Sequence, residues 1–122
     1  MPSQGGAPPG VLTSTITSIT LVGGTYNVFW TTDNFVPVIG GGPDAHHIHF
    51  YFDTVGVVNA GVPQSGPWIL WDANEGAGRG SPFDGYGVND RPVGATQMCV
   101  TVATNDHAVD NVNFFHCMDL PG

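Results

Sequence analysis

The stretch DAHHIHFYFDT, residues 44–54, places three histidines within four positions and follows them at once with aromatic residues. Histidine is the commonest protein ligand of transition metals, and it also serves as a general base and a pH sensor. Side chains alternate along a β-strand, so His47 and His49 would share one face, about 6.5–7 Å apart along the strand. Two imidazoles at that spacing can hold one divalent ion, and His-x-His pairs of this kind suit zinc and copper.

The other face of the same strand would carry Ile48, Phe50 and Phe52, so we expect that face to meet the core and His47 and His49 to point away from it. A firm site needs a third ligand. In an immunoglobulin-like strand order the third strand pairs antiparallel with the sixth, which would bring further ligands from the end of the sixth strand and from nearby loops. The expected metal ligands are His47, His49, His107 and Asp106, and the loops would add Asp44 and Asp110.

Other roles for these histidines remain open. Exposed strand histidines on a surface with few charges would simply supply polarity, and the same residues would serve a pH sensor. A metal-bound water held by the cluster would instead support a metal-dependent hydrolase. His116 is expected to face Val100 across a hairpin and to be structural.

Two loops carry oxygen ligands that suit calcium. Asp72, Asn74 and Glu75 precede a glycine-rich stretch, and Asp110 lies in a second turn. Ordinary turn chemistry, in which Asp and Asn bond their own backbone, is the alternative for both. Trp68 and Trp71 would point to opposite faces of one strand, and an exposed one could stack on a sugar.

The elements that position these residues are strands. No window of a dozen residues keeps helical apolar spacing without Gly or Pro, and β-branched and aromatic residues dominate the apolar runs. GG at 23–24 predicts a hairpin turn. The pattern predicts an all-β, two-sheet immunoglobulin-like sandwich of about seven strands, at residues 11–21, 25–32, 46–54, 66–72, 86–88, 95–105 and 111–120.

The two cysteines test that expectation. Cys99 and Cys117 are centred on residue 108, so a hairpin turning in DHAVD would place them opposite each other. The symmetry predicts a cross-strand disulfide worth roughly 3 kcal/mol, with two buried free thiols as the alternative. A disulfide implies an oxidising compartment, hence an extracellular or cell-surface protein.

Composition limits the partners. Two Arg and no Lys stand against ten carboxylates, giving a net charge of −8. Nucleic acid is therefore an unsuitable partner, as is an anionic membrane surface. No apolar run reaches the length of a membrane helix. Residues 1–10 form a Gly/Pro-rich extension and residues 11–122 a single domain.

Low surface charge also suggests an alternative function, a self-assembling subunit of an extracellular filament or surface layer. Its N-terminal strand, within residues 7–21, would add to a neighbouring copy as a homo-oligomer or polymer contact.

Three segments resemble a group of uncharacterised secreted bacterial proteins: HIHFYFDT, GPWILWD and DRPVGATQMC. The likeness runs roughly from residue 25 to residue 121. It implies secretion and a shared architecture, and it names no ligand.

Overall fold

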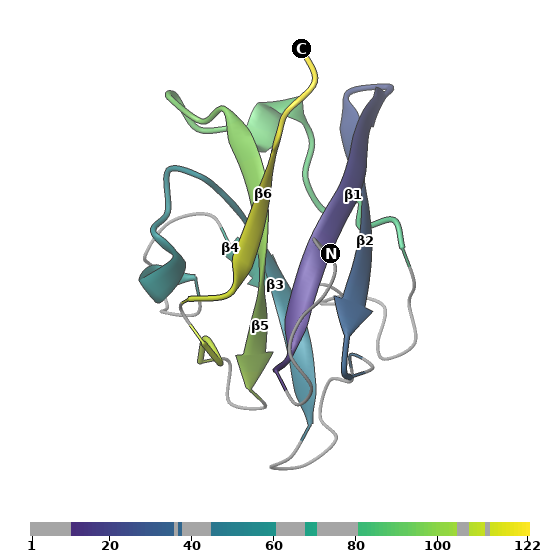
Figure 1. Ribbon diagram of the computed structural model, residues 1–122. Coiled ribbons are helices and arrows are strands. Elements are labelled where there is room, and N and C mark those ends of the chain that lie inside the picture. The colour runs from purple at the N-terminus through teal and green to yellow at the C-terminus, as the bar shows by residue number, and fades with distance from the viewer. Residues whose placement is uncertain are drawn as a thin grey trace.

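The computed structural model describes residues 11–35, 37, 45–60, 68–70, 81–104, 108–111 and 113–122 (Figure 1). In this part of the chain the fold is all-β, as expected, with strands, two short 3-10 helices and no α-helix. The N-terminal extension, 1–10, lies outside it. The elements are β1 (Thr13–Val22), β2 (Thr25–Asp33), β3 (His46–Phe52), η1 (Val57–Asn59), β4 (Trp68–Leu70), η2 (Val88–Asp90), β5 (Gln97–Thr104) and β6 (Phe115–Asp119).

The first sheet is the predicted hairpin of β1 and β2. Gly23 and Gly24 both have positive φ, 58° and 82°, which the two-residue turn requires and which glycine adopts without strain. The ladder runs from Val22–Thr25 to Thr13–Asp33, with a bulge between Ile16 and Ser18. β1 pairs with β2 of the same chain along its whole length. To add to the sheet of another copy, β1 would therefore have to give up its hydrogen bonds to β2.

The second sheet has the strand order β4-β3-β5-β6, all antiparallel. The expected pairing of the histidine strand with the Cys99 strand is confirmed, in a register that sets His46 opposite Thr104 and Phe52 opposite Met98. The central strands β3 and β5 therefore fix what lies beside each histidine.

The strand expected at 86–88 is not formed. Phe83 and Gly87 make only isolated bridges to β2, at Val28 and Thr25, and η2 begins at Val88. Where the Phe83 bridge forms, its two backbone hydrogen bonds have ordinary N···O distances of 2.8 Å (Phe83 N–H to the Val28 carbonyl) and 2.9 Å (Val28 N–H to the Phe83 carbonyl). Exposed Asp84 and Gly85 separate the two bridges, so the ladder is interrupted and this segment is an irregular margin of the first sheet.

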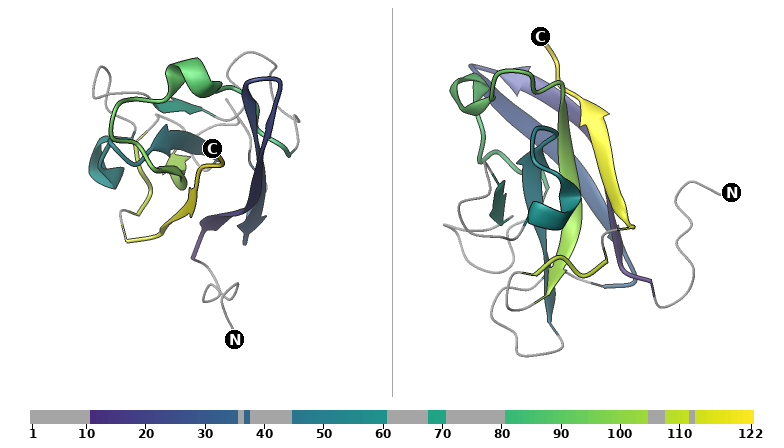
Figure 2. Two further views of the ribbon diagram at one scale, coloured as in Figure 1. Left: turned by 90° about the horizontal axis from the view of Figure 1, so that it is seen from above. Right: turned by 90° about the vertical axis from the view of Figure 1, so that its left-hand side faces the viewer.

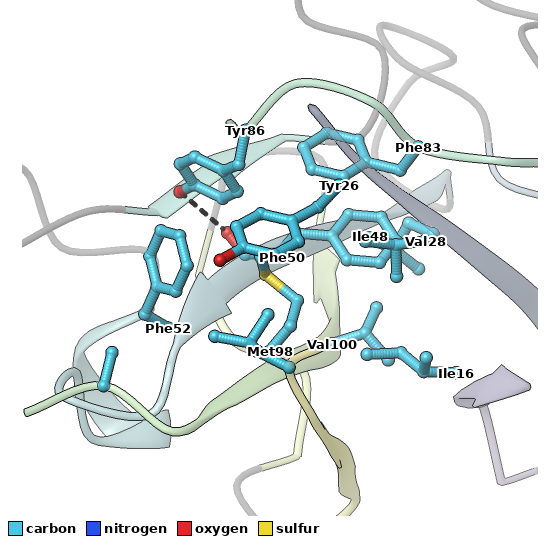
Figure 3. Close-up of a cluster of buried hydrophobic side chains, with 12 residues drawn as sticks. Ile16, Tyr26, Val28, Ile48, Phe50, Phe52, Phe83, Tyr86, Met98 and Val100 are labelled. Atoms are coloured by element: carbon cyan, nitrogen blue, oxygen red, sulfur yellow. Dashed lines mark hydrogen bonds between the residues drawn. The ribbon is translucent and has the colours of Figure 1, made fainter. Parts of the chain in front are cut away.

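The hydrophobic core lies between the two sheets (Figure 3). Phe50 of β3 stacks on Phe83 with ring centroids 4.2 Å apart. The Tyr86 hydroxyl donates a hydrogen bond to the Phe50 carbonyl at 3.3 Å. The even-numbered face of β3 thus meets the core, as the alternation predicted. The other buried members include Ile16, Tyr26, Val28, Ile48, Phe52, Met98 and Val100.

β1 and β6, from different sheets, lie side by side and run in the same direction (Figures 1 and 2). His116 on β6 is paired with Val100, as expected, and its Nδ1 accepts a hydrogen bond from the Ile16 backbone N–H of β1 at 3.2 Å. The bulge beside Ile16 interrupts the β1–β2 ladder at this point. His116 is therefore a structural bridge between the two sheets. Burial lowers the pKa of His116, which keeps the accepting nitrogen unprotonated near neutral pH.

The predicted disulfide is present. Cys99 and Cys117 are directly opposite in the β5–β6 ladder and are bonded to each other. Both lie in one sheet, so this bond does not cross the core as the bridge of antibody domains does.

Candidate metal site

His47, His49 and Tyr51 share the odd-numbered face of β3, which points away from the core between the sheets. The direction of the two histidines is as predicted, but the alternative in which they are exposed and only supply surface polarity is wrong, because His47 and His49 are 1% and 0% exposed. Tyr51 is buried as well, at 1% exposed. The four-stranded sheet is thus buried on both faces at β3.

Residues 53–60, which include η1, cover part of this outer face. Val55, Val57 and Ala60 pack with Tyr51 and the disulfide in a second hydrophobic cluster, joined by Val109. The start of the segment is fixed to the sheet, because the Asp53 carboxylate accepts from the Thr96 N–H at 2.9 Å and the Thr96 hydroxyl at 2.7 Å. Burial opposes ionisation of Asp53, but these hydrogen bonds outweigh it and lower its pKa. We call residues 53–60 the cover segment.

The two imidazoles meet inside this layer. Nε2 of His47 lies 3.0 Å from Nε2 of His49, with ring centroids 4.9 Å apart and ring planes inclined by 49°. Nδ1 of His49 lies 2.6 Å from the carbonyl oxygen of Ala60 in the cover segment. A carbonyl only accepts, so Nδ1 of His49 carries the proton and donates it.

This hydrogen bond sets the chemistry of the pair. With its proton on Nδ1, a neutral His49 presents a lone pair at Nε2, and Nε2 of His47 donates to it. Metal-ligating histidines show the same pattern, one ring nitrogen bonded to a carbonyl and the other free to ligate. The neighbours on β5 are small, since His47 is paired with Ala103 and His49 with Thr101.

Tyr51 adds a polar group to the layer. Its hydroxyl is buried and has no hydrogen-bond partner among the described residues. Burial raises the pKa of Tyr51 well above its ordinary value, so the phenol stays protonated. Sequence reasoning missed this residue as a site member, although its position four residues after His47 was enough to place it on the same face.

Asp110 does not join the pair. Its carboxylate lies 3.3 Å from Nε2 of His46, and its backbone N–H donates to the Val102 carbonyl at 2.8 Å. His46 is on the opposite face of β3 from His47, because successive strand residues alternate. In the structure Asp110 is thus placed beside His46, and its contribution to a site at His47 and His49 stays a prediction.

The remaining expected ligands lie outside the described residues: Asp44, Asp72, Asn74, Glu75, Asp106 and His107. Trp71 does so as well. Within the described ranges, no group of three or more His, Cys, Asp or Glu side chains is placed to hold a metal ion. The structure thus brings together two of the expected ligands.

Comparison with known proteins gives no match to a family model, a curated protein or a solved structure. No helix in the described part of the chain is long and apolar enough to cross a membrane.

Proposed function

We propose that this chain is a secreted, non-catalytic module of immunoglobulin-like β-sandwich type that binds a divalent metal ion through Nε2 of His47 and of His49. The observation that carries the proposal is the 3.0 Å approach of these nitrogens, with His49 oriented by the Ala60 carbonyl. Two imidazoles on one ion have their nitrogens about 2.8–3.4 Å apart, given metal–nitrogen distances of about 2.0–2.1 Å and bond angles of about 90–109°.

The environment supports neutral ligands. Metal binding requires an unprotonated Nε2 on each ring. Nε2 of His49 meets this requirement, whereas Nε2 of His47 donates a hydrogen bond to His49, so an ion would replace that hydrogen bond and the proton would have to leave Nε2 of His47. Both imidazoles are fully buried, which disfavours their charged forms. A charge of −8 on the chain favours the approach of cations over anions.

The fold and compartment are supported by other features. Two antiparallel sheets that share one hydrophobic core are typical of a sandwich. The Cys99–Cys117 bond is of a kind that persists in oxidising compartments, which supports secretion.

The test uses a variant of His49 that removes the ligand atom Nε2 and keeps a hydrogen bond to the Ala60 carbonyl. In His49→Asn the amide N–H replaces Nδ1–H towards the Ala60 carbonyl, and Nε2 is lost. His46→Asn is the matched control, since His46 is a neighbour on the opposite face. Equilibrium dialysis against Zn²⁺, Cu²⁺ and Ca²⁺ should show one transition-metal ion bound by wild type and by His46→Asn, and none by His49→Asn.

A second measurement needs no variant. Metal at 100 times its dissociation constant stabilises the folded state by about 2.7 kcal/mol, and the ¹⁵N resonances of both imidazoles should shift together. If the pair is purely structural, neither unfolding temperature nor imidazole resonances will respond to metal, and the proposal fails.

A further inference from the structure

We propose that one end of the molecule, formed by the β1–β2 turn, η2 with the loop after it, and the residues after β6, docks a basic amphipathic segment of another protein. We call this end, residues 21–24, 88–94 and 119–122, the turn end. It presents exposed apolar side chains next to carboxylates. The proposal does not depend on metal binding at His47 and His49.

The exposed apolar side chains are concentrated at the turn end. Six large apolar side chains are exposed in the described part of the chain, and four of them lie here: Leu21, Val22, Val88 and Val93. Figures 1 and 2 show the β1–β2 turn, the segment 88–94 and the C-terminal residues at the same end of the molecule. Single exposed apolar residues are ordinary, but a group of them marks a contact surface.

The two main parts of this surface are fixed to each other. The Val88 N–H donates to the Gly24 carbonyl at 2.9 Å. A Cβ on Gly87 would lie 2.8 Å from the Gly24 carbonyl oxygen, so this segment packs directly on the turn. The Asp90 carboxylate accepts from the Gly87 N–H at 2.8 Å and closes η2. The surface is thus formed before a partner arrives, which lowers the ordering cost of association.

Carboxylates accompany the apolar group. Asp90 ends η2 and Asp119 ends β6, so both belong to the turn end. Asp53 lies beside them, because its carboxylate is bonded to Thr96, and the Thr96 carbonyl accepts from the Leu120 N–H. All three carboxylates are exposed.

The nearby cation is already engaged within the fold. Arg91 is the one Arg or Lys side chain among the described residues. Its Nε donates to the Ala95 carbonyl at 3.0 Å, and its Nη1 donates to the Tyr26 hydroxyl at 3.4 Å. One partly buried guanidinium faces three carboxylates, so the turn end stays net negative.

This combination determines the chemistry of the partner. Apolar side chains beside carboxylates are complementary to a segment that has one apolar face and Lys or Arg next to it. A second copy docked through the same end would bring like charges together, which is unfavourable. An anionic membrane surface is disfavoured for the same reason. A basic amphipathic segment meets both requirements.

The test uses a synthetic amphipathic helix of Leu and Lys as the probe and the same peptide with Glu in place of Lys as its control. In ¹⁵N-labelled intact protein, the Lys peptide should shift the amide resonances of the turn end, and the Glu peptide should leave them unchanged. This mapping needs no variant of the protein, so it decides the location even if a substitution disturbs folding.

Variants then separate the apolar from the charged contribution. Val22→Ser/Val88→Ser should weaken binding of the Lys peptide by about tenfold. Phe115→Ser, which removes an exposed apolar side chain at the start of β6, should leave it unchanged. Asp119→Asn should weaken binding and reduce its salt dependence more than Asp33→Asn, which makes the same charge change at the end of β2.

Three results would overturn the proposal. The first is a set of resonance shifts spread over the whole surface, or equal weakening by Val22→Ser/Val88→Ser and Phe115→Ser. The second is a wild-type dimer that the double variant abolishes in sedimentation, which would make a second copy the occupant. The third is uptake by phosphatidylcholine vesicles that the double variant abolishes, which would make the turn end a lipid contact.

Discussion

Tyr51→Phe and Tyr86→Phe make the same chemical change in two buried tyrosines, and we expect opposite effects on stability. Tyr51 and Tyr86 are 1% and 5% exposed. The Tyr86 hydroxyl donates to the Phe50 carbonyl, whereas the Tyr51 hydroxyl has no partner among the described residues.

The magnitudes follow from hydrogen-bond energetics. Removing the Tyr86 hydroxyl loses one rather long bond and should lower the free energy of unfolding by about 0.5–1.5 kcal/mol. Removing the Tyr51 hydroxyl relieves a buried, unbonded polar group, whose desolvation costs about 1–3 kcal/mol, so the variant should be more stable than wild type. The two variants should differ by about 2 kcal/mol or more.

Urea unfolding of metal-free protein, followed by tryptophan fluorescence and by circular dichroism, measures both variants against wild type. With a slope of about 1–3 kcal/mol/M, the midpoints should be separated by roughly 1 M. If Tyr51→Phe is as destabilising as Tyr86→Phe, the Tyr51 hydroxyl has a partner in solution, and the account of the layer around it is wrong.

Two other predictions concern the disulfide and the bridge between the sheets. Reduction of the Cys99–Cys117 disulfide, which spans a sequence separation of 18, should lower the free energy of unfolding by about 3 kcal/mol. As a control, the reductant should leave the stability of a Cys99→Ala/Cys117→Ala variant unchanged. If reduction does not shift the urea midpoint of wild type, the pairing of β5 and β6 alone holds the hairpin. Because burial lowers the pKa of His116, the unfolded state binds more protons as pH falls through about 6.5, so stability should be full above that pH and decline below it. His116→Asn, which keeps an acceptor for the Ile16 N–H, should lose that part of the acid sensitivity, and identical pH profiles for the two proteins would contradict the assignment.

Local chemistry made much of the fold predictable. The glycine pair at 23–24 marks its turn, and the placement of Cys99 and Cys117 about residue 108 gives the register of β5 with β6. The apolar alternation of Ile48, Phe50 and Phe52 identifies the core face of β3. In each case the determining residues are neighbours in sequence or symmetric about a turn.

Burial of the histidine face was not predictable in the same way. This burial depends on where the cover segment lies in the fold, and the residues around Val57 and Ala60 show no periodic apolar pattern that predicts its position. A signal was present, because Tyr51 and Cys99 put apolar bulk on the outer face of the sheet, and strands buried on both faces lose clean alternation. The contact of Asp110 with His46 was not predictable either, because it depends on how the chain returns beside β5, where Val109 bridges to Ala103.

The parallel course of β1 and β6 determines how the folded chain would bear mechanical load. Tension applied between the beginning of β1 and the end of β6 pulls these neighbours past each other in shear, and the Cys99–Cys117 bond lies outside that line of force because it joins β6 only to β5. Within the described residues, the load therefore falls on side-chain packing and on the His116–Ile16 bond. Resistance to pulling is governed by the unfolding rate, and it would weaken in acid as that imidazole takes up a proton.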